Sequence, residues 1–382
     1  MKHYNFLLVG AGLFNIVLAR KLTNNGYKCL IIDKRSHIGG NCYTERKFNI
    51  DIHMYGPHIF HTSDKEIWDF ANSYGEFESF QLNVKANYNG EIYSLPFNMN
   101  TFYELFKSYH PKHAYDIINK EIQEYLNTHS CYITNLEEYA ISKVGKTIYD
   151  KLIKEYTEKQ WNKPCSDLSP EIIKRLPIRL TYNNNYFNDK YQGLPKEGYT
   201  IWMMNMIYGL NEKSIKVELG KNFLHNKKYW MNIADKIIYC GEPDKLMDCQ
   251  IGELEWRSLR FEHSIVKNDL LNDQGCPIMN YTSKTVDYTR SIDQKYLTPN
   301  YEKCDNKIMT YEFPQNYELN KTEAYYPINN DKNEELYQKY VELIKEKYPN
   351  IILGGRLGLY KYLDMDDTIY EANKLYEKIR MS

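Results

Sequence analysis

The sequence lacks the patterns that mark secreted, zinc-binding and membrane-spanning proteins. Its eight cysteines are scattered and form no CxxC pair, which argues against a zinc site and against a disulfide framework. Unpatterned cysteines are typical of a reducing compartment. No apolar run approaches the roughly 18 residues that a membrane helix needs, and the first residues resemble no signal peptide. We therefore expect a cytoplasmic protein that does not enter the membrane.

An excess of charge of one sign is also missing. The chain of 382 residues has 49 basic and 50 acidic side chains, so electrostatics give no reason to expect a nucleic acid or an anionic membrane as partner. The chain also lacks the GxSxG, GxxxxGK[ST] and HExxH motifs, which excludes three common kinds of catalytic site. If the protein is an enzyme, we expect a cofactor to carry out the difficult chemical step.

The first forty residues contain the clearest pattern. A short apolar run at residues 6–9 ends in Gly10 and Gly12, a helical pattern follows, and a second apolar run at residues 29–32 ends in Asp33. In a strand–turn–helix–strand unit, such glycines let a pyrophosphate approach the backbone at a helix N-terminus, and the acidic residue binds a ribose hydroxyl. Asn15 stands where the motif has a third glycine. The unit predicts dinucleotide binding; the alternative is an ordinary glycine-rich turn.

The rest of the chain predicts an α/β fold in which other structures interrupt this dinucleotide domain. Asn89-Gly90 between two strand-like runs indicates a hairpin. Helical patterns occur at 102–109, 114–126, 136–144 and 148–158, and strand patterns at 214–219 and 236–240, with further short strand signals between 254 and 313. A strand at 351–353 and a helix at 368–381 return to the first domain. We expect the following segments: cofactor domain at 1–80, 206–250 and 331–382; sheet strands at 81–100 and 181–205; a helical domain with a mobile lid loop at 101–180; and an antiparallel sheet domain for substrate at 251–330.

Several short segments combine arginine, tyrosine and turn residues. A guanidinium matches the geometry of a phosphate, so Arg175, Arg290 and Arg356 are candidates for an anion site. The alternative for each one taken singly is a solvated surface charge; the aromatic, turn-rich segments around them favour a site. Tyr156 and Trp161 could stack on a base, or pack on a helix face.

Two further pairs are open to the same double interpretation. Tyr326 and Tyr362 could donate phenolic hydrogen bonds to a diphosphate or could pack in the core. His58 and His61 could be structural histidines held by hydrogen bonds. They could also belong to a metal site, but no third ligand is evident, so we expect no metal.

Taken together, these segments resemble the UDP-galactopyranose mutase family over essentially the whole chain. The motifs that carry the resemblance are VGAGLF (9–14), KRSHIGGN (34–41), YGPHIFHT (55–62), YTEKQW (156–161), IIKRLPIR (172–179), YQGLPKEGYT (191–200), YTR (288–290), YYPIN (325–329) and GGRLGLYKYLDMD (354–366). The fold that this implies is a Rossmann-like FAD-binding domain with a helical insertion and an antiparallel sheet domain.

The resemblance also implies an activity. It is that of an isomerase of the intramolecular transferase class (EC 5.4.99), in which N5 of reduced FAD attacks the anomeric carbon of a nucleotide sugar and the sugar changes between pyranose and furanose forms. UDP-galactose is the substrate expected from the family, with galactofuranose serving capsule or lipopolysaccharide synthesis. dTDP-fucose, UDP-arabinose and a 6-deoxyheptose nucleotide are alternatives, and a FAD-dependent oxidoreductase is the alternative from another class. The resemblance further implies a homodimer and an external reductant such as NAD(P)H.

The family's functional residues can be assigned to matching positions. The catalytic positions are Arg175, Arg290 and His58. The FAD positions are Gly10, Gly12, Phe14, Asp33, Lys34, Gly40, Asn41, His58, Ile59, Asn222, Phe223, Arg356, Asp364, Met365 and Thr368. The substrate positions are Tyr156, Thr157, Trp161, Arg175, Tyr186, Asn280, Arg290, Tyr326 and Tyr362. The chain departs from the family pattern at Pro57, where the galactose enzymes have alanine, and at Leu82-Asn83, where they have Asn-Ser.

Overall fold

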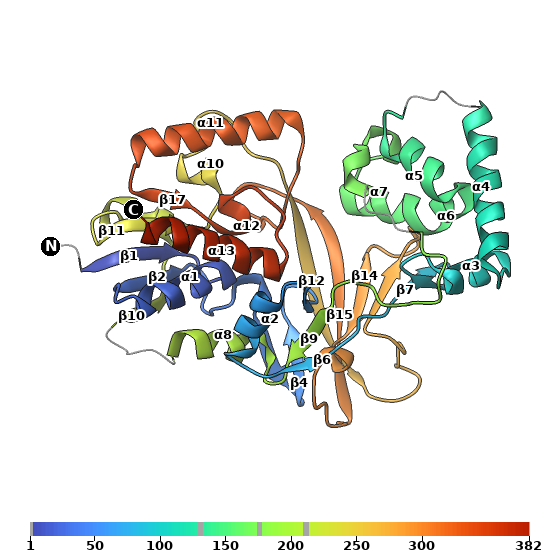
Figure 1. Cartoon of the computed structure of the whole chain (residues 1–382), viewed down its shortest axis with the longest axis horizontal. Coiled ribbons are helices and arrows are strands. Elements are labelled where there is room, and N and C mark those ends of the chain that lie inside the picture. Colours follow the sequence, from blue (N-terminus) through green and yellow to red (C-terminus); the bar gives the residue numbers. More distant parts are fainter. Residues whose placement is uncertain (1–2, 129–132, 174–177, 209–213, 382) are drawn as a thin grey trace.

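The protein has two main sheets and a separate group of helices (Figure 1). The computed structural model describes residues 3–128, 133–173, 178–208 and 214–381. Its mixed architecture confirms the α/β fold predicted from the sequence. The two sheets lie next to each other, and the helices α3 to α7 form a lobe at the far side of the larger sheet.

The smaller sheet is parallel and is assembled from distant parts of the chain. Its order is β10-β2-β1-β11-β17. The strands are β1 (Tyr4–Val9), β2 (Cys29–Asp33), β10 (Ile215–Leu219), β11 (Ala234–Tyr239) and β17 (Ile351–Leu353). All pairs are parallel, so the carboxyl ends of the strands meet at one edge, the edge at which such sheets bind ligands. The strands predicted at residues 29–32, 214–219, 236–240 and 351–353 are confirmed.

Helices cover both faces of this sheet. Because side chains alternate along a strand, Phe6 and Leu8 face one buried cluster while Leu7 faces the other. On the first face lie α1 (Leu13–Asn24), α8 (Gly198–Tyr208) and α13 (Met365–Arg380); on the second face lie α10 (Pro243–Leu246) and α11 (Asp331–Lys347).

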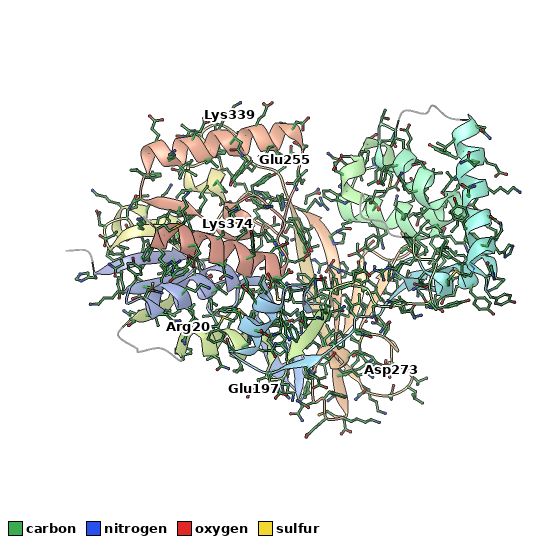
Figure 2. All side chains as sticks on the ribbon, in the orientation of Figure 1. Arg20, Glu197, Glu255, Asp273, Lys339 and Lys374 are labelled. Carbon is green, nitrogen blue, oxygen red and sulfur yellow. The ribbon has the colours of Figure 1, made fainter. Side chains whose placement is uncertain are left out.

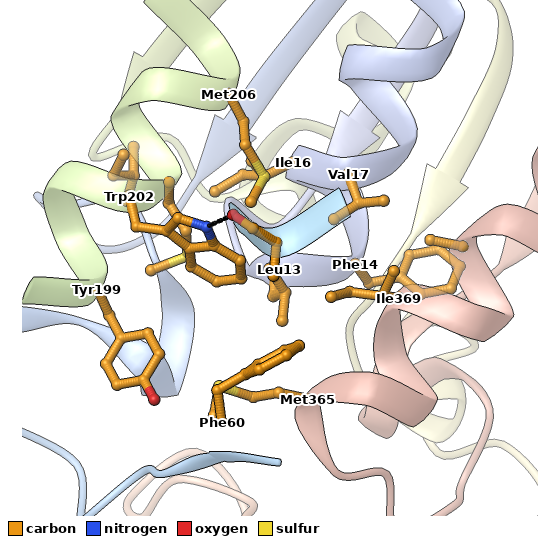
Figure 3. Packing of buried hydrophobic residues seen from close by; sticks show 14 of the residues in the cluster. Leu13, Phe14, Ile16, Val17, Phe60, Tyr199, Trp202, Met206, Met365 and Ile369 are labelled. Atoms are coloured by element: carbon orange, nitrogen blue, oxygen red, sulfur yellow. Dashed lines mark hydrogen bonds between the residues drawn. The ribbon is translucent and has the colours of Figure 1, made fainter. Parts of the chain in front are cut away.

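Figure 3 shows the packing on the first face. Leu13 and Val17 of α1 lie between Trp202 of α8 and Ile369 of α13. The indole of Trp202 donates a hydrogen bond to the carbonyl oxygen of Ala71 (2.8 Å), so its one polar atom is satisfied within the core. This packing fixes the N-terminal ends of α1 and α13 relative to each other.

The larger sheet has seven strands in the order β16-β12-β15-β14-β13-β7-β8. They are β7 (Val84–Tyr88), β8 (Glu91–Leu95), β12 (Trp256–Lys267), β13 (Ile278–Tyr281), β14 (Arg290–Asp293), β15 (Asn306–Asn316) and β16 (Tyr326–Pro327). The predicted hairpin is confirmed, with Asn89 and Gly90 at positive φ between β7 and β8. The strands within residues 251–330 pair antiparallel, as predicted, whereas β7 and β13 run parallel. These strands come from distant segments, so no hairpin forces them to run in opposite directions.

The helical lobe follows the prediction with shifted boundaries. It contains α3 (Met99–Phe106), α4 (Pro111–Thr128), α5 (Leu136–Val144), α6 (Lys146–Ile148) and α7 (Glu155–Trp161). Helix α3 begins three residues earlier than predicted because Asn98 caps it, its side chain accepting from the Asn100 N–H. The helix predicted at 148–158 is divided, since a π-helical stretch, Tyr149–Lys154, separates α6 from α7.

Residues 181–205 differ most from the prediction. They were expected to form sheet strands, but they contain the single strand β9 (Tyr191–Pro195), which pairs with β5 (Phe60–Thr62) and β6 (Phe77–Ser79). Helix α8 then begins at Gly198. Trp202, Met203 and Met206 recur at helical spacing and are buried against α1, so tertiary packing favours a helix here.

The remaining elements are short. They are β3 (Thr44–Lys47), β4 (Ile50–His53), α2 (Lys65–Asn72), α9 (Lys227–Trp230), α12 (Gly355–Gly358) and several 3-10 turns. Figure 2 shows charged side chains of both signs at the periphery, such as Lys339 on α11 and Asp273 beyond β12. In the part of the chain that the structure describes, no helix is both long and apolar enough to span a membrane.

Candidate active site

A cavity of about 770 Å³ joins the carboxyl edge of the parallel sheet to one face of the larger sheet. Gly10, Gly12 and Asp33 line one end, and Arg290 and Tyr326 line the other. The cavity therefore brings together the two groups of residues that the sequence analysis assigned separately to cofactor and substrate.

The turn after β1 leaves room for a ligand at the start of α1. Gly10 has φ 103°, a conformation that favours glycine. A Cβ on Gly40 would come within 3.0 Å of the Gly12 Cα, so these glycines let the two backbone segments approach closely. The first N–H groups of α1 have no partner within the helix and are suited to a phosphate.

Asn15 takes over part of the role of the missing glycine. Its side chain is fully buried and its amide nitrogen donates to the carbonyl oxygens of Val9 (3.0 Å) and Gly10 (2.8 Å). Helix α1 is thus attached to the end of β1 by hydrogen bonds, where a glycine would attach it only by close packing.

Asp33 organises the nucleoside end of the cavity. Its carboxylate oxygens accept hydrogen bonds from the backbone N–H groups of Ala11 (2.7 Å) and Arg35 (2.8 Å). Each carboxylate oxygen can accept a second bond, so Asp33 can still bind a ribose hydroxyl. This fits the role assigned to it from the resemblance.

A segment between β15 and β16 covers this end of the cavity. Glu323 of this segment accepts from Lys34 (2.9 Å) and lies 3.4 Å from the Arg35 guanidinium. Arg35 also stacks over the Tyr55 ring at 4.2 Å and donates to Asn41 (3.1 Å). The predicted residues Lys34 and Asn41 thus line the cavity. Arg35 and Glu323 line it too but were not predicted, because charged residues in two distant loops give no sign in the sequence that they meet.

His58 lines the middle of the cavity in a neutral state. Its Nδ1 lies 2.8 Å from the Gly56 carbonyl oxygen, which can only accept, so Nδ1 carries the hydrogen and Nε2 is the acceptor. Burial and the nearby charge of Arg356 lower the pKa of His58 to about 4. The backbone N–H of His58 donates to Nδ1 of His53 (3.1 Å), a buried histidine whose pKa is lowered to about 3, mainly by burial.

The start of α13 forms the wall opposite the glycine turn. Arg356 donates to the Leu363 carbonyl (2.6 Å) and lies 4.7 Å from the centre of the Tyr362 ring. The Tyr362 hydroxyl donates to Asp364 (3.1 Å), the residue just before α13. Met365 and Thr368, in the first turns of this helix, line the same cavity.

Arg290 is the main cation at the far end. It lies opposite Glu312 in the pairing of β14 with β15. Its Nε donates to Glu312 Oε1 (3.0 Å), and its second nitrogen donates to Oε1 (2.9 Å) and Oε2 (2.7 Å). Glu312 is only 2% exposed, so the guanidinium is held by a buried carboxylate while its remaining N–H groups are available to a ligand.

Polar and aromatic groups surround this arginine. Asn280 is paired directly with Arg290 across β13 and β14, and its Oδ1 is buried without a hydrogen-bond partner. Tyr156, Tyr186 and Tyr326 also line this end. A buried acceptor without a partner is costly to a protein, and this one belongs to a residue of the cavity lining, where the donor of a ligand can reach it.

Some predicted residues lie elsewhere. Thr157 is 5% exposed and lies away from the cavity lining, and Trp161 packs against the buried cluster of the helical lobe. Arg175 lies outside the described residues. The predicted FAD positions Phe14, Ile59, Asn222 and Phe223 all line the cavity. Glu312 was not predicted, because a lone glutamate in a strand pattern gives no sign of the residue opposite it.

The cavity suits a long dinucleotide such as FAD. Bare glycine backbone and a helix N-terminus lie at the pyrophosphate turn, Asp33 lies at the ribose position, and α13 begins at the other side. Among the described residues, no group of three or more metal-ligating side chains occurs.

Comparisons with known proteins give the family. A family model described as UDP-galactopyranose mutase matches residues 151–362, and one described as an NAD(P)-binding Rossmann-like domain matches residues 8–74. A probable UDP-galactopyranose mutase of Klebsiella pneumoniae is 38% identical, covering 100% of this chain and 96% of its own. A dTDP-fucopyranose mutase of Escherichia coli is 36% identical, covering 96% of both chains.

Solved structures support the fold. A crystal structure of reduced UDP-galactopyranose mutase superposes with a TM-score of 0.76 at 14% identity, covering 100% of this chain and 94% of its own. A putrescine oxidase superposes with a TM-score of 0.57 at 10% identity, covering both chains completely. At these identities the likeness concerns the fold alone, and the family follows from the sequence matches. The chain belongs to the UDP-galactopyranose mutase family of flavin-dependent pyranose–furanose mutases, and its cofactor is FAD.

Proposed function

We propose that the protein interconverts UDP-galactopyranose and UDP-galactofuranose at the Arg290 end of the cavity. The observation that carries this proposal is the buried Arg290–Glu312 pair beside the unpaired Asn280 oxygen. A guanidinium held in one orientation binds a diphosphate through two parallel N–H bonds. Both relatives named above are mutases of nucleotide sugars by name, and such substrates carry a diphosphate.

The cofactor supplies the reactive group and the chain supplies its surroundings. Reduced FAD provides a nucleophilic ring nitrogen suited to the anomeric carbon of the sugar. Arg290 holds the diphosphate through departure and return, and its charge stabilises the leaving group. Tyr326 and Tyr362, whose rings lie 5.8 Å apart, can donate to the same oxygens. Arg175 is proposed as the second arginine of this clamp.

Two further groups match the needs of an electron-rich flavin. The N-terminal turn of α13 faces the cavity with Met365 and Thr368, and the positive end of a helix dipole favours negative charge. His58 remains neutral because burial lowers its pKa to about 4. Its Nε2 therefore accepts a hydrogen bond from cofactor or sugar without adding a second cation beside Arg356.

A second candidate substrate is dTDP-fucopyranose, the substrate named for the E. coli relative. One wall of the sugar region favours it. Leu82 and Val84 are 3% and 4% exposed and line the cavity together with Ile278. An apolar wall leaves a C6 hydroxyl without a partner but accommodates a C6 methyl group. We propose that this apolar wall determines which of the two sugars the protein prefers.

The test is a substrate panel with the reduced protein. UDP-galactopyranose, dTDP-fucopyranose, UDP-arabinopyranose and a nucleotide-linked 6-deoxyheptose are incubated with protein reduced by dithionite, and the furanose products are separated by HPLC. Highest kcat/KM on UDP-galactose supports the first candidate. Highest kcat/KM on a 6-deoxy sugar supports the second, and Leu82→Asn should then shift the ratio toward UDP-galactose.

Further proposals concern the setting of the reaction. Seven described cysteines are free, which supports a reducing, cytoplasmic location. From the family we propose a homodimer, tested by light scattering, and NAD(P)H as the external reductant, tested by flavin bleaching under anaerobic conditions. The furanose product would serve synthesis of a capsule or lipopolysaccharide, tested by deleting the gene and analysing the surface sugars.

A further inference from the structure

One lysine joins the helical lobe to the turn that precedes Arg290. Nζ of Lys159, on α7, donates to three carbonyl oxygens: those of Tyr281 (2.8 Å), Val286 (3.2 Å) and Tyr288 (3.0 Å). An ammonium group has three hydrogens, so all of them are used. The three acceptors belong to the turn at residues 281–288, between β13 and β14.

This contact connects two walls of the substrate end. Lys159 lies three residues after Tyr156 on the same helix, so the two residues are neighbours on one side of α7. Tyr288 lies two residues before Arg290, at the start of β14. Tyr156 and Arg290 are thus connected through Lys159 and the turn that it binds. Figure 1 shows α7 on the side of the lobe that faces the sheets.

The same helix and turn make two further polar contacts. The backbone N–H of Lys284 donates to Glu155 (2.6 Å), and Nζ of Lys284 donates to Glu158 (2.6 Å). The Lys284 side chain is 54% exposed, so water competes with the second contact. Lys159 is more deeply buried than Lys284. Water therefore competes less with its hydrogen bonds than with those of Lys284.

The charge of Lys159 is sensitive to pH near neutrality. Burial lowers its pKa to about 8, against the opposing influence of Glu155 and Asp287. Glu158 and Lys284 are the other charged groups of the contact. Above pH 8 the neutral amine has two hydrogens for three carbonyl acceptors, so one carbonyl loses its partner. The join between α7 and the turn therefore weakens as the pH rises.

We propose that Lys159 is a positioning residue for the nucleotide part of the substrate, holding Tyr156 on α7 at a fixed place relative to Arg290. The inference rests on the proposed function, in which Arg290 holds the diphosphate, and on the substrate-binding role that the family resemblance implies for Tyr156. Lys159 itself touches neither, since it lies outside the cavity lining. Loss of the Lys159 contact should therefore weaken the affinity for the nucleotide and leave FAD binding unchanged.

The test compares Lys159→Arg and Lys159→Met with a matched control. Lys151→Met removes another lysine of the helical lobe, one that donates to Glu91 (2.7 Å) and Tyr93 (2.9 Å) away from the cavity. UDP and dTDP are titrated into the FAD-loaded proteins between pH 6 and 10, and KM and kcat are measured with the preferred nucleotide sugar. FAD content and circular dichroism report folding.

The expected result is a rise in Kd and KM of about tenfold or more for Lys159→Met at pH 7, equivalent to about 1.4 kcal/mol, with FAD content unchanged. Wild-type Kd should rise above pH 8, and Lys159→Arg, which keeps its charge, should bind equally from pH 7 to 10. Lys151→Met should resemble wild type. A Kd for Lys159→Met within twofold of wild type, or the same alkaline rise in Lys159→Arg, would overturn the inference. If wild-type protein binds neither UDP nor dTDP, the proposed function fails instead.

Discussion

Arg290 and Glu312 lie directly opposite each other on β14 and β15 and share three hydrogen bonds of 2.7–3.0 Å. Because Glu312 is buried, the pair cannot exchange freely with water. The carboxylate uses one edge of the guanidinium, which leaves the other N–H groups free to face the cavity. In the proposed function, Glu312 is thus a positioning residue that sets the orientation in which Arg290 meets a diphosphate.

The first prediction concerns this pair. Glu312→Gln should lower kcat/KM by about 100-fold, because loss of one partner from a buried charge pair costs about 2–5 kcal/mol. Arg290→Lys should lower it comparably, since an ammonium cannot form the two-pronged contact. The measurement is steady-state turnover with dithionite-reduced protein. Glu262→Gln removes an exposed partner of Arg260 from the same sheet and should stay within about twofold of wild type; a matching loss there would contradict the account.

The second prediction concerns the motif position at Asn15. Asn15→Gly restores the usual glycine but removes the hydrogen bonds to the carbonyls of Val9 and Gly10. The Val9 carbonyl keeps the backbone N–H of Cys240 as a partner (3.1 Å), so only the Gly10 carbonyl is left unpaired. We expect a loss of about 1–3 kcal/mol in unfolding free energy from that carbonyl, with about 1 kcal/mol more from glycine in a helix. Urea unfolding of the FAD-loaded protein measures this. An unchanged or higher midpoint for Asn15→Gly would show that the side chain contributes nothing.

The third prediction is a pH dependence of stability. In the folded protein the pKa of His53 is lowered to about 3 and that of His58 to about 4, whereas both are near 6.5 when unfolded. Below pH 6.5 the unfolded chain therefore binds protons that the folded chain does not, and stability falls as the pH drops. From pH 6.5 to 5 each histidine should cost about 2 kcal/mol.

Unfolding of wild type and His58→Asn at pH 5 and 7 tests this. The buried carboxyl of Asp244, whose pKa burial raises to about 6, acts in the opposite direction, but it is present in both proteins and cancels in the comparison. The acid loss should be smaller in His58→Asn by about 2 kcal/mol. Equal acid losses would mean that His58 is protonated in the folded protein.

The fourth prediction concerns the segment that covers the cofactor. Glu323→Gln breaks the contacts to Lys34 and Arg35 and should speed FAD release several-fold, measured as the gain of free-flavin fluorescence after dilution. Glu318→Gln is the matched control, because Glu318 pairs with Lys321 inside the same segment. Equal release rates for the two variants would contradict the role given to the contacts of Glu323 with Lys34 and Arg35.

Local patterns in the sequence account for much of the fold. The β1–α1–β2 unit and the Asn89-Gly90 hairpin follow from residues close together in the chain, because turns and helix starts are set by neighbours. Helix α8 was missed because two of its exposed positions, Ile201 and Tyr208, are apolar as well, which hides the one-sided burial of its other apolar residues from the sequence pattern. The direction of β13 against β7 depends on the joining of distant segments and has no local signal.

The same distinction holds at the candidate site. Gly10, Asp33 and Arg290 stand in recognisable motifs and line the cavity. Glu312 stands in no motif, since its importance comes from strand register. Lys159 belongs to the YTEKQW motif, but its contact with the turn at residues 281–288 has no signal in the sequence. Trp161 belongs to a motif, but its ring packs in the helical lobe. A motif thus identifies a segment, while tertiary packing decides which of its side chains face the ligand.

The most direct test of the central claim is conversion of nucleotide sugars by the protein with reduced and with oxidised FAD. The protein is incubated anaerobically with UDP-galactofuranose or dTDP-fucofuranose, with and without dithionite, and the pyranose products are quantified by HPLC. The account predicts conversion of at least one sugar by the reduced protein and none by the oxidised protein. Bound FAD with no ring interconversion in the reduced state would contradict it.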